Sequence, residues 1–198
     1  MTILDLKRQL DLSSLVKKKS FFLLGPRSTG KTHWIKKCFS EEVPYISLNN
    51  TNYYNRLMAN PSELFEIIIP HKKVKLAIID EIQKIPTLLD EVQELIENEG
   101  IKFLLTGSSA RKLKRTNANM LGGRAATIGF YPLSFSEIPE FDLIKYLRWG
   151  GLPRVYLSDD PELELDAYIK TYLEEEIRLE ANIRNLPPFH RFLKTAAL

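Results

Sequence analysis

One eight-residue segment constrains the fold of this 198-residue chain more than any other feature. Residues Gly25 to Thr32, GPRSTGKT, match the pattern G-x-x-x-x-G-K-[ST] at every defined position. The apolar run of residues 21–24 before this segment reads as a buried strand, and a helix is expected to follow it. Between such a strand and helix, the glycines let backbone N–H groups turn into one concavity at the positive end of the helix. The segment therefore predicts a phosphate-binding loop and a bound nucleoside triphosphate.

Each residue of the loop is expected to contribute to nucleotide binding: Gly25, Pro26, Arg27, Ser28, Thr29, Gly30, Lys31 and Thr32. Lys31 is expected to reach the outer phosphates. The hydroxyl of Thr32 is expected to coordinate Mg²⁺, so this ion is the predicted companion of the nucleotide.

The elements after the loop are expected to alternate between strand and helix. Strands are predicted at residues 21–24, 44–48, 74–79 and 101–105, and helices at 32–39, 61–69 and 88–99. Asn60 is the expected cap of the second helix, and Gly100 is placed to end the third. Continuous apolar strands are typical of a parallel sheet that is covered on both faces. We therefore predict an α/β fold, namely a P-loop NTPase core with three layers, αβα, followed by a small helical C-terminal region.

Two adjacent carboxylates, Asp80 and Glu81, follow the strand of residues 74–79. Because the carboxyl ends of parallel strands meet at one edge of the sheet, the pair is expected to lie near the phosphate loop. Asp80 is predicted to hold Mg²⁺, and Glu81 is predicted to orient and deprotonate the water that attacks the γ-phosphate. An Asp-Glu pair at a strand end also occurs as a plain surface pair, but the preceding loop and strand favour the catalytic interpretation.

A polar cluster of residues 106–109 ends the next strand. Ser108 is the favoured candidate for a catalytic hydroxyl that senses the γ-phosphate or holds the attacking water, and Thr106 is the second. The alternative, in which Ser109 only caps a helix beginning at Ala110, is compatible with this role of Ser108.

Arg124 follows a pair of glycines that could deliver its guanidinium to the transferring phosphate, in the same subunit or in a neighbour. It is therefore a predicted catalytic residue, and it is also the reason to consider oligomerisation. A structural salt bridge is the alternative for Arg124. The basic run of residues 111–115 lacks interleaved aromatic residues and is interpreted as a solvated helix rather than a nucleic-acid contact.

Composition limits the partners and the cellular locations that fit this chain. The net charge of +3 comes from basic residues spread along the chain, so a protein or DNA partner stays open. The single cysteine, Cys38, cannot form an internal disulfide, and the N-terminus lacks the zones of a signal peptide. No apolar run approaches the roughly 20 residues of a membrane helix, so we expect no membrane partner and a cytoplasmic location. The histidines lie too far apart in sequence to suggest a metal site.

Five segments together resemble a family of prokaryotic predicted ATPases in the AAA+ superfamily: GPRSTGKT, LAIIDEIQKIP, FLLTGSSA, MLGGRAATIGFYPLSFSEI and LRWGGLPRVYL. The resemblance implies an AAA-type core with Lys31 and Thr32 in the Walker A motif, Asp80 and Glu81 in the Walker B motif, and Ser108 near the first sensor. It also implies ATP rather than GTP as the nucleotide. By the same likeness, Arg154 is a candidate second-sensor arginine that contacts the nucleotide.

The expected organisation is an ATPase core over residues 1–140, with an amphipathic leader at its start, and a small helical segment over residues 141–198. Members of the family usually continue into a C-terminal domain of unknown function, often with a winged-helix or nuclease-like character. This chain stops at Leu198, so we expect most of that domain to be missing, or the terminal apolar face to dock elsewhere. A long helix is predicted over residues 165–177, followed by a break at Pro187.

The favoured function is an AAA-type ATPase that couples Mg²⁺-dependent ATP hydrolysis to a conformational change. A nucleotide-dependent switch that hydrolyses weakly and binds a protein or DNA partner is the alternative. A small-molecule phosphotransferase fits the phosphate loop equally well, but it does not explain the adjacent Asp80 and Glu81.

Overall fold

The structure is a computed structural model that describes residues 6–70, 74–108, 113, 121–170, 188, 191, 192 and 195. Within this part of the chain, five parallel strands form one sheet of order β2-β3-β4-β1-β5. The strands are β1 (Ser20–Leu24), β2 (Tyr45–Ser47), β3 (Leu76–Asp80), β4 (Lys102–Gly107) and β5 (Ala125–Gly129). The predicted α/β fold with a parallel sheet is confirmed.

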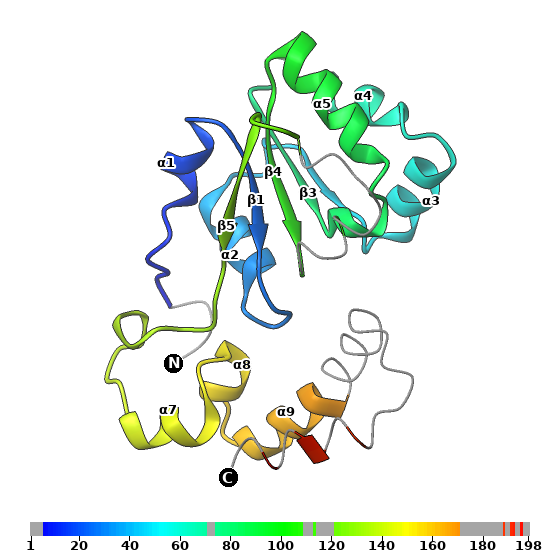
Figure 1. The fold of residues 1–198 in the computed structure, drawn as a ribbon. Helices are drawn as coiled ribbons and strands as arrows, with labels where there is room; N and C mark the ends of the chain where they lie inside the picture. Colours follow the sequence, from blue (N-terminus) through cyan, green and yellow to red (C-terminus); the bar gives the residue numbers. More distant parts are fainter. Residues whose placement is uncertain are drawn as a thin grey trace.

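Helices cover both faces of the sheet, as Figure 1 shows. One face carries α1 (Leu12–Val16) and α2 (Lys31–Cys38), and the other carries α3 (Thr51–Ala59), α4 (Glu63–Ile68) and α5 (Leu88–Glu99). Strand β1 is buried at every position, and its side chains alternate between the two cores: Phe22 and Leu24 pack on the α5 side, whereas Phe21 and Leu23 pack on the α2 side. This alternation follows from the period of two in a strand.

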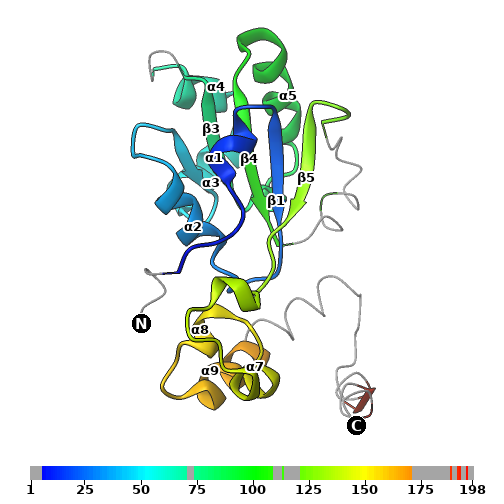
Figure 2. The same ribbon diagram turned by 90° about the vertical axis from the view of Figure 1, so that its left-hand side faces the viewer.

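A small helical region lies at the carboxyl ends of the strands (Figures 1 and 2). It contains the short 3₁₀ helix η3 (Phe135–Glu137) and helices α7 (Leu143–Trp149), α8 (Pro153–Tyr156) and α9 (Pro161–Tyr168). A separate apolar cluster of Leu6, Leu133, Ile138 and Tyr156 joins this region to the N-terminal segment. The expected boundary after residue 140 stays a prediction.

The structure also contains elements that the sequence pattern did not predict. Helix α3 fills a stretch for which no element was predicted, and within it only Leu57 is buried, which gives a weak apolar periodicity. Strand β5 was not predicted because this edge strand is short of large apolar residues and none of its residues is fully buried. Helix α4 begins at Glu63 rather than at residue 61, and the Asn60 side chain accepts from the hydroxyl of Ser62 instead of capping the helix.

Several expectations concern residues outside the described ranges. They are the basic run of residues 111–115 apart from Leu113, the cap at Ser109, and most of the helix expected over residues 165–177 with the break at Pro187.

Candidate nucleotide-binding site

The phosphate loop connects β1 to α2 and is braced on both sides. The N–H of Gly25 donates to the carbonyl of Gly107 in β4 at 3.2 Å, and the N–H of Phe130 after β5 donates to the carbonyl of Leu24 at 2.6 Å. A Cβ atom on Gly25 would lie 1.9 Å from the carbonyl oxygen of Phe130, so only glycine fits there. Gly30 has a φ of 90° at the start of α2, a conformation that glycine adopts without strain.

Lys31 lies across the inside of this loop. Its ammonium donates to the carbonyls of Gly25 at 2.7 Å and Pro26 at 2.9 Å. The Thr29 hydroxyl also donates to the Pro26 carbonyl, at 2.9 Å. Two neutral carbonyls of the loop thus hold the ammonium of Lys31, which was predicted to reach the outer phosphates. An anionic phosphate is a stronger acceptor for an ammonium than these carbonyls are.

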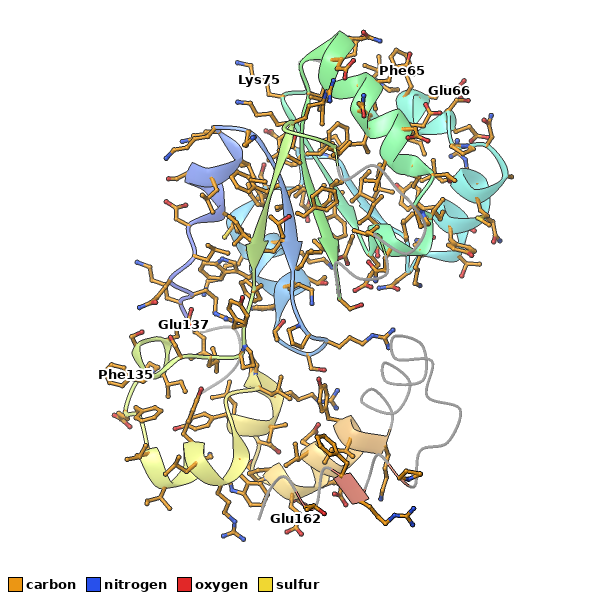
Figure 3. The ribbon with its side chains drawn as sticks, viewed as in Figure 1. Phe65, Glu66, Lys75, Phe135, Glu137 and Glu162 are labelled. Carbon is orange, nitrogen blue, oxygen red and sulfur yellow. The ribbon has the colours of Figure 1, made fainter. Side chains whose placement is uncertain are left out.

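A buried arginine that the sequence analysis missed supports the loop from below. The guanidinium of Arg8 donates to the carbonyl of Thr29 at 2.9 Å and to that of Tyr131 at 2.5 Å, and it lies 4.1 Å from the ring centroid of Phe130. It also forms an ion pair of 3.0 Å with Glu137 in η3. Arg8 therefore connects the phosphate loop to the segment that leads into the helical region. Figure 3 labels Glu137 in this segment.

Glu137 is held in its charged form by this environment. Burial alone would raise its pKa, but hydrogen bonds from the N–H groups of Ser134 and Gln9 and from Arg8 outweigh burial and hold the pKa below its ordinary value. Glu137 also completes a capping box with Ser134 at the start of η3. The segment PLSFSE was noted in the sequence only as part of a motif. Its last residue, Glu137, supplies the carboxylate that accepts from Arg8.

Asp80 is the centre of a hydroxyl cluster at the carboxyl edge of the sheet. Its Oδ2 atom accepts from the Tyr45 hydroxyl at 2.7 Å and from the Thr32 hydroxyl at 3.2 Å, and Oδ1 accepts from the Thr106 hydroxyl. Burial, then the charge of Asp80, raises the pKa of Tyr45 above its ordinary value, so this phenol stays a donor. The structure brings Thr32 and Asp80 together from α2 and β3, which are far apart in sequence.

Oxygen atoms dominate this cluster, and oxygen is the ligand type that Mg²⁺ prefers. The carboxylate of Asp80 and the hydroxyl of Thr32 together fit a magnesium ion that is shared with a nucleotide phosphate. Among the described residues there is no group of three or more His, Cys, Asp or Glu side chains that could hold a metal by itself.

Glu81 has an unusual backbone. Its φ is 65° and its ψ is 43°, in the left-handed region that non-glycine residues seldom adopt. The N–H of Glu81 donates to the Thr106 hydroxyl at 3.0 Å, and its side chain accepts from the amide of Gln83. Such local strain persists where the surrounding structure over-determines it, which often happens at functional sites.

The two candidate hydroxyls at the end of β4, those of Thr106 and Ser108, have different surroundings. Thr106 is fully buried and links Asp80 to the backbone of Glu81. The hydroxyl of Ser108 is buried and has no hydrogen-bond partner among the described residues. Thr106 therefore already positions Asp80 and the backbone of Glu81. The role predicted for Ser108 requires a bound ligand or water that forms a hydrogen bond with its hydroxyl.

The structure corrects the prediction for Arg124 as a finger acting within its own subunit. Strands β1 and β5 are parallel, with Ser20 beside Ala125 and Leu24 beside Gly129, so Arg124 lies at the amino edge of the sheet, opposite to the phosphate loop. There its guanidinium pairs with Glu97 at 2.5 Å. This ion pair agrees with the alternative interpretation of Arg124 as a structural salt bridge. A role of Arg124 as a finger that acts on a neighbouring subunit stays a prediction.

Arg154 lies closer to the loop. It lines a cavity of about 130 Å³ together with Ser28 of the phosphate loop and residues of α9. Its guanidinium pairs with Glu164 at 2.7 Å, across α8 and α9. The helical region therefore presents an arginine beside the phosphate loop, although a contact of Arg154 with nucleotide remains a prediction.

His33 is a further residue that the sequence analysis passed over. Its Nε2 atom is buried and has no hydrogen-bond partner in the described part of the chain. It lines a small cavity of about 20 Å³ beside Gly30, together with Leu6, Leu133 and Pro153. Its signal in sequence is only its position two residues after Lys31, and the sequence analysis considered the histidines only as metal ligands.

The parallel sheet, the braced loop after β1 and the carboxylate after β3 define a P-loop NTPase. A family model described as an AAA domain matches residues 17–139, and the chain belongs to this family. A second model, described as a domain of unknown function, matches residues 140–198. No helix among the described residues is long and apolar enough to span a membrane.

The similar proteins are themselves uncharacterized. One from Methanocaldococcus jannaschii is 28% identical over 183 residues, which cover 81% of this chain and 41% of the relative. A protein from Haemophilus influenzae is 27% identical over 136 residues, which cover 62% of this chain and 34% of the relative. A second protein from M. jannaschii is 27% identical, and 45% of it is covered. The chain thus spans less than half the length of these relatives.

Proposed function

We propose that this protein is an ATP-binding AAA-type ATPase that hydrolyses ATP with Mg²⁺ and couples hydrolysis to a conformational change. The observation that carries the proposal is the contact between Thr32 of the phosphate loop and Asp80 of β3, with Glu81 next in the chain. A loop for phosphates, a carboxylate for the metal and a second carboxylate for the water are the parts that hydrolysis of a γ-phosphate requires.

Each group has one task in this proposal. Bound Mg²⁺ would supply charge neutralisation on the phosphates, and Thr32 and Asp80 would hold it. Lys31 would exchange its carbonyl acceptors for phosphate oxygens. Thr106 keeps Asp80 and the backbone of Glu81 in register, and Glu81 would accept the proton of the attacking water.

The coupling to a conformational change is supported by contacts between the loop and the helical region. Arg8 joins Thr29 to Glu137, and Arg154 of α8 lines a cavity with Ser28. The cavity beside Gly30 and His33, at about 20 Å³, is far smaller than a typical small-molecule pocket, which has about 300 Å³ or more. If the base enters there, α8 must move away from the loop, and this motion is the one we assign to nucleotide binding.

A nucleotide-dependent switch with weak hydrolysis is the second candidate. It is favoured by the contacts of the phosphate loop with the helical region, because Arg8 and Arg154 would transmit the nucleotide state to that region without turnover. Such a switch would act on a protein or DNA partner, and assembly into an oligomer would belong to the same state change.

The test measures ATP binding first and ADP release second, with purified protein and Mg²⁺. Lys31→Ala is expected to lose both binding and turnover, whereas Glu81→Gln is expected to bind ATP and lose turnover by about 100-fold or more. Gln93→Leu on the surface of α5 is the control and should match the wild type. Tight ATP binding without turnover in the wild type would favour the switch, and an equal turnover in Glu81→Gln would remove Glu81 as the base.

A further inference from the structure

Two buried polar atoms near the end of β4 have no hydrogen-bond partner among the described residues. They are the hydroxyl oxygen of Ser108 and the amide oxygen Oε1 of Gln83. Ser108 itself is 8% exposed, so solvent does not satisfy its hydroxyl. Buried polar atoms in native proteins are nearly always paired, and each exception needs an explanation.

Gln83 is held in one orientation by its neighbours. It lies on the 3₁₀ helix η2 (Ile82–Lys84), directly after Glu81, and its Nε2 atom donates to Oε2 of Glu81. A carboxylate only accepts hydrogen bonds, so the amide nitrogen must face Glu81 and Oε1 must face elsewhere. Oε1 faces Gly107, because a Cβ atom built on that glycine would lie 2.8 Å from it.

The unpaired groups therefore lie at the same edge of the sheet. Gly107 is the residue before Ser108, and it is in contact with the Gln83 amide, which in turn is bonded to Glu81. One acceptor (Oε1 of Gln83), one hydroxyl that can donate (Ser108) and one carboxylate (Glu81) thus gather at the carboxyl edge of the sheet. The next strand in the sheet, β1, leads into the phosphate loop at this same edge.

We infer that Gln83 completes, together with Glu81 and the hydroxyl already predicted for Ser108, the site of the water that attacks the γ-phosphate. A water molecule has two protons and two lone pairs. It would donate to Glu81 and to Oε1 of Gln83, and it would accept from the hydroxyl of Ser108. One lone pair then remains, and it faces the phosphorus. This inference rests on the proposed ATPase activity and assigns Gln83 a role that the DEIQ motif alone did not reveal.

The step balances without a further reactant. The water oxygen forms a bond to the γ-phosphorus while the bond from that phosphorus to the bridging oxygen breaks, and ADP leaves with the electron pair. One water proton moves to Glu81, and the other stays on the inorganic phosphate. Gln83 and Ser108 remain neutral, so their contribution is the orientation of the water and of the Glu81 carboxylate.

The experiment compares Gln83→Met and Ser108→Ala with two surface controls, Gln93→Met and Ser40→Ala. Gln93 is a matched control because its amide also donates to a glutamate, Glu97 at 3.0 Å, but on the exposed face of α5. We measure kcat and KM for MgATP, affinity for a non-hydrolysable ATP analogue, affinity for ADP with aluminium fluoride, and the melting temperature. Aluminium fluoride imitates the transferring phosphoryl group with a water at the attacking position, so its complex reports on the water site without turnover.

We expect kcat to fall about 100-fold in Gln83→Met and about 10-fold or more in Ser108→Ala, with KM changed less than about twofold. Affinity for the aluminium fluoride complex should fall by a similar factor, while affinity for the ATP analogue stays the same. The melting temperature of Ser108→Ala should stay the same or rise, because the substitution removes a buried unpaired hydroxyl. The controls should match the wild type in every measurement.

Three results would overturn the inference. One is an unchanged kcat in both variants while Glu81→Gln is inactive, which would leave the ATPase proposal standing. Another is an equal loss of affinity for the ATP analogue and the aluminium fluoride complex together with a lower melting temperature, which would mean a structural role. A wild type that binds ATP but neither hydrolyses it nor forms the aluminium fluoride complex would overturn this inference together with the proposed hydrolysis.

Discussion

The contact between Arg8 and Glu137 allows a quantitative test of how the N-terminal segment supports the phosphate loop. The ion pair spans 3.0 Å, and its side chains are only 8% and 7% exposed. Arg8→Met keeps the length of the side chain but leaves the carboxylate of Glu137 buried without its cation. Removing one partner of a buried ion pair costs about 3–5 kcal/mol. At about 2–4 °C per kcal/mol for a chain of this size, the melting temperature should fall by roughly 10 °C.

Urea unfolding of three variants measures this effect. The double variant Arg8→Met with Glu137→Gln should recover part of the loss, because the uncompensated charge is removed. Arg56→Met is the control, since the pair of Arg56 with Glu63 is half exposed and such pairs contribute about 0–1 kcal/mol. If Arg8→Met lowers the free energy of unfolding no more than Arg56→Met does, the ion pair of Arg8 and Glu137 is not buried in solution and the reasoning fails.

The pH dependence of the same pair follows from the lowered pKa of Glu137. A carboxylate whose pKa is lower in the folded protein stabilises the fold fully above its unfolded pKa, at about 4.3. This stabilisation is lost as the pH falls through the folded pKa. The difference in unfolding free energy between the wild type and Glu137→Gln should therefore be largest near neutral pH and shrink below about pH 4. A difference that is constant from pH 7 to pH 3 would contradict this assignment.

Three further predictions concern the loop and its surroundings. Gly25→Ala should abolish ATP binding, measured by titration, because the new Cβ would lie 1.9 Å from the carbonyl oxygen of Phe130; retained affinity would show that the loop can move at no cost. Thr106→Val should lower the free energy of unfolding by about 1–3 kcal/mol and weaken Mg²⁺-dependent ATP binding, because Asp80 loses a donor; an unchanged variant would remove the positioning role. Arg124→Ala should change stability by no more than about 1 kcal/mol and leave kcat unchanged, and a fall in kcat at high protein concentration would restore a finger between subunits.

Some elements of this fold are encoded by residues close in the chain, and others depend on contacts between distant residues. The phosphate loop, strands β1, β3 and β4 and helix α5 were predictable because neighbours in the chain encode them through apolar runs, glycines and capping residues. Helix α3 and strand β5 were not predictable in this way, because their burial is weak and their formation depends on packing against other elements. Local propensity is a weak guide where tertiary contacts decide.

The same distinction holds for the candidate site. The sequence placed Asp80 and Glu81 at a strand end and Thr32 in the loop after another strand, and a parallel sheet must bring both to one edge; their roles there remain proposals. It also placed Arg124 after two glycines, but only the strand register showed that this residue lies at the opposite edge. A residue type and its neighbours in the chain do not specify which end of the sheet a loop occupies until the strand that follows the loop is known.

By itself, then, the sequence determined the fold class, the phosphate loop and which strands end in polar residues. These features depend on residues that are close in the chain. Only the tertiary structure decided that Arg8 joins the loop at Thr29 to Glu137, which lies 129 residues from Arg8 in the chain. Only the structure likewise decided that Tyr45 and Thr106 donate to Asp80 and that Gln83 holds Glu81. These contacts depend on how helices and strands pack in three dimensions, and side-chain packing has no signature in the spacing of residues along the chain.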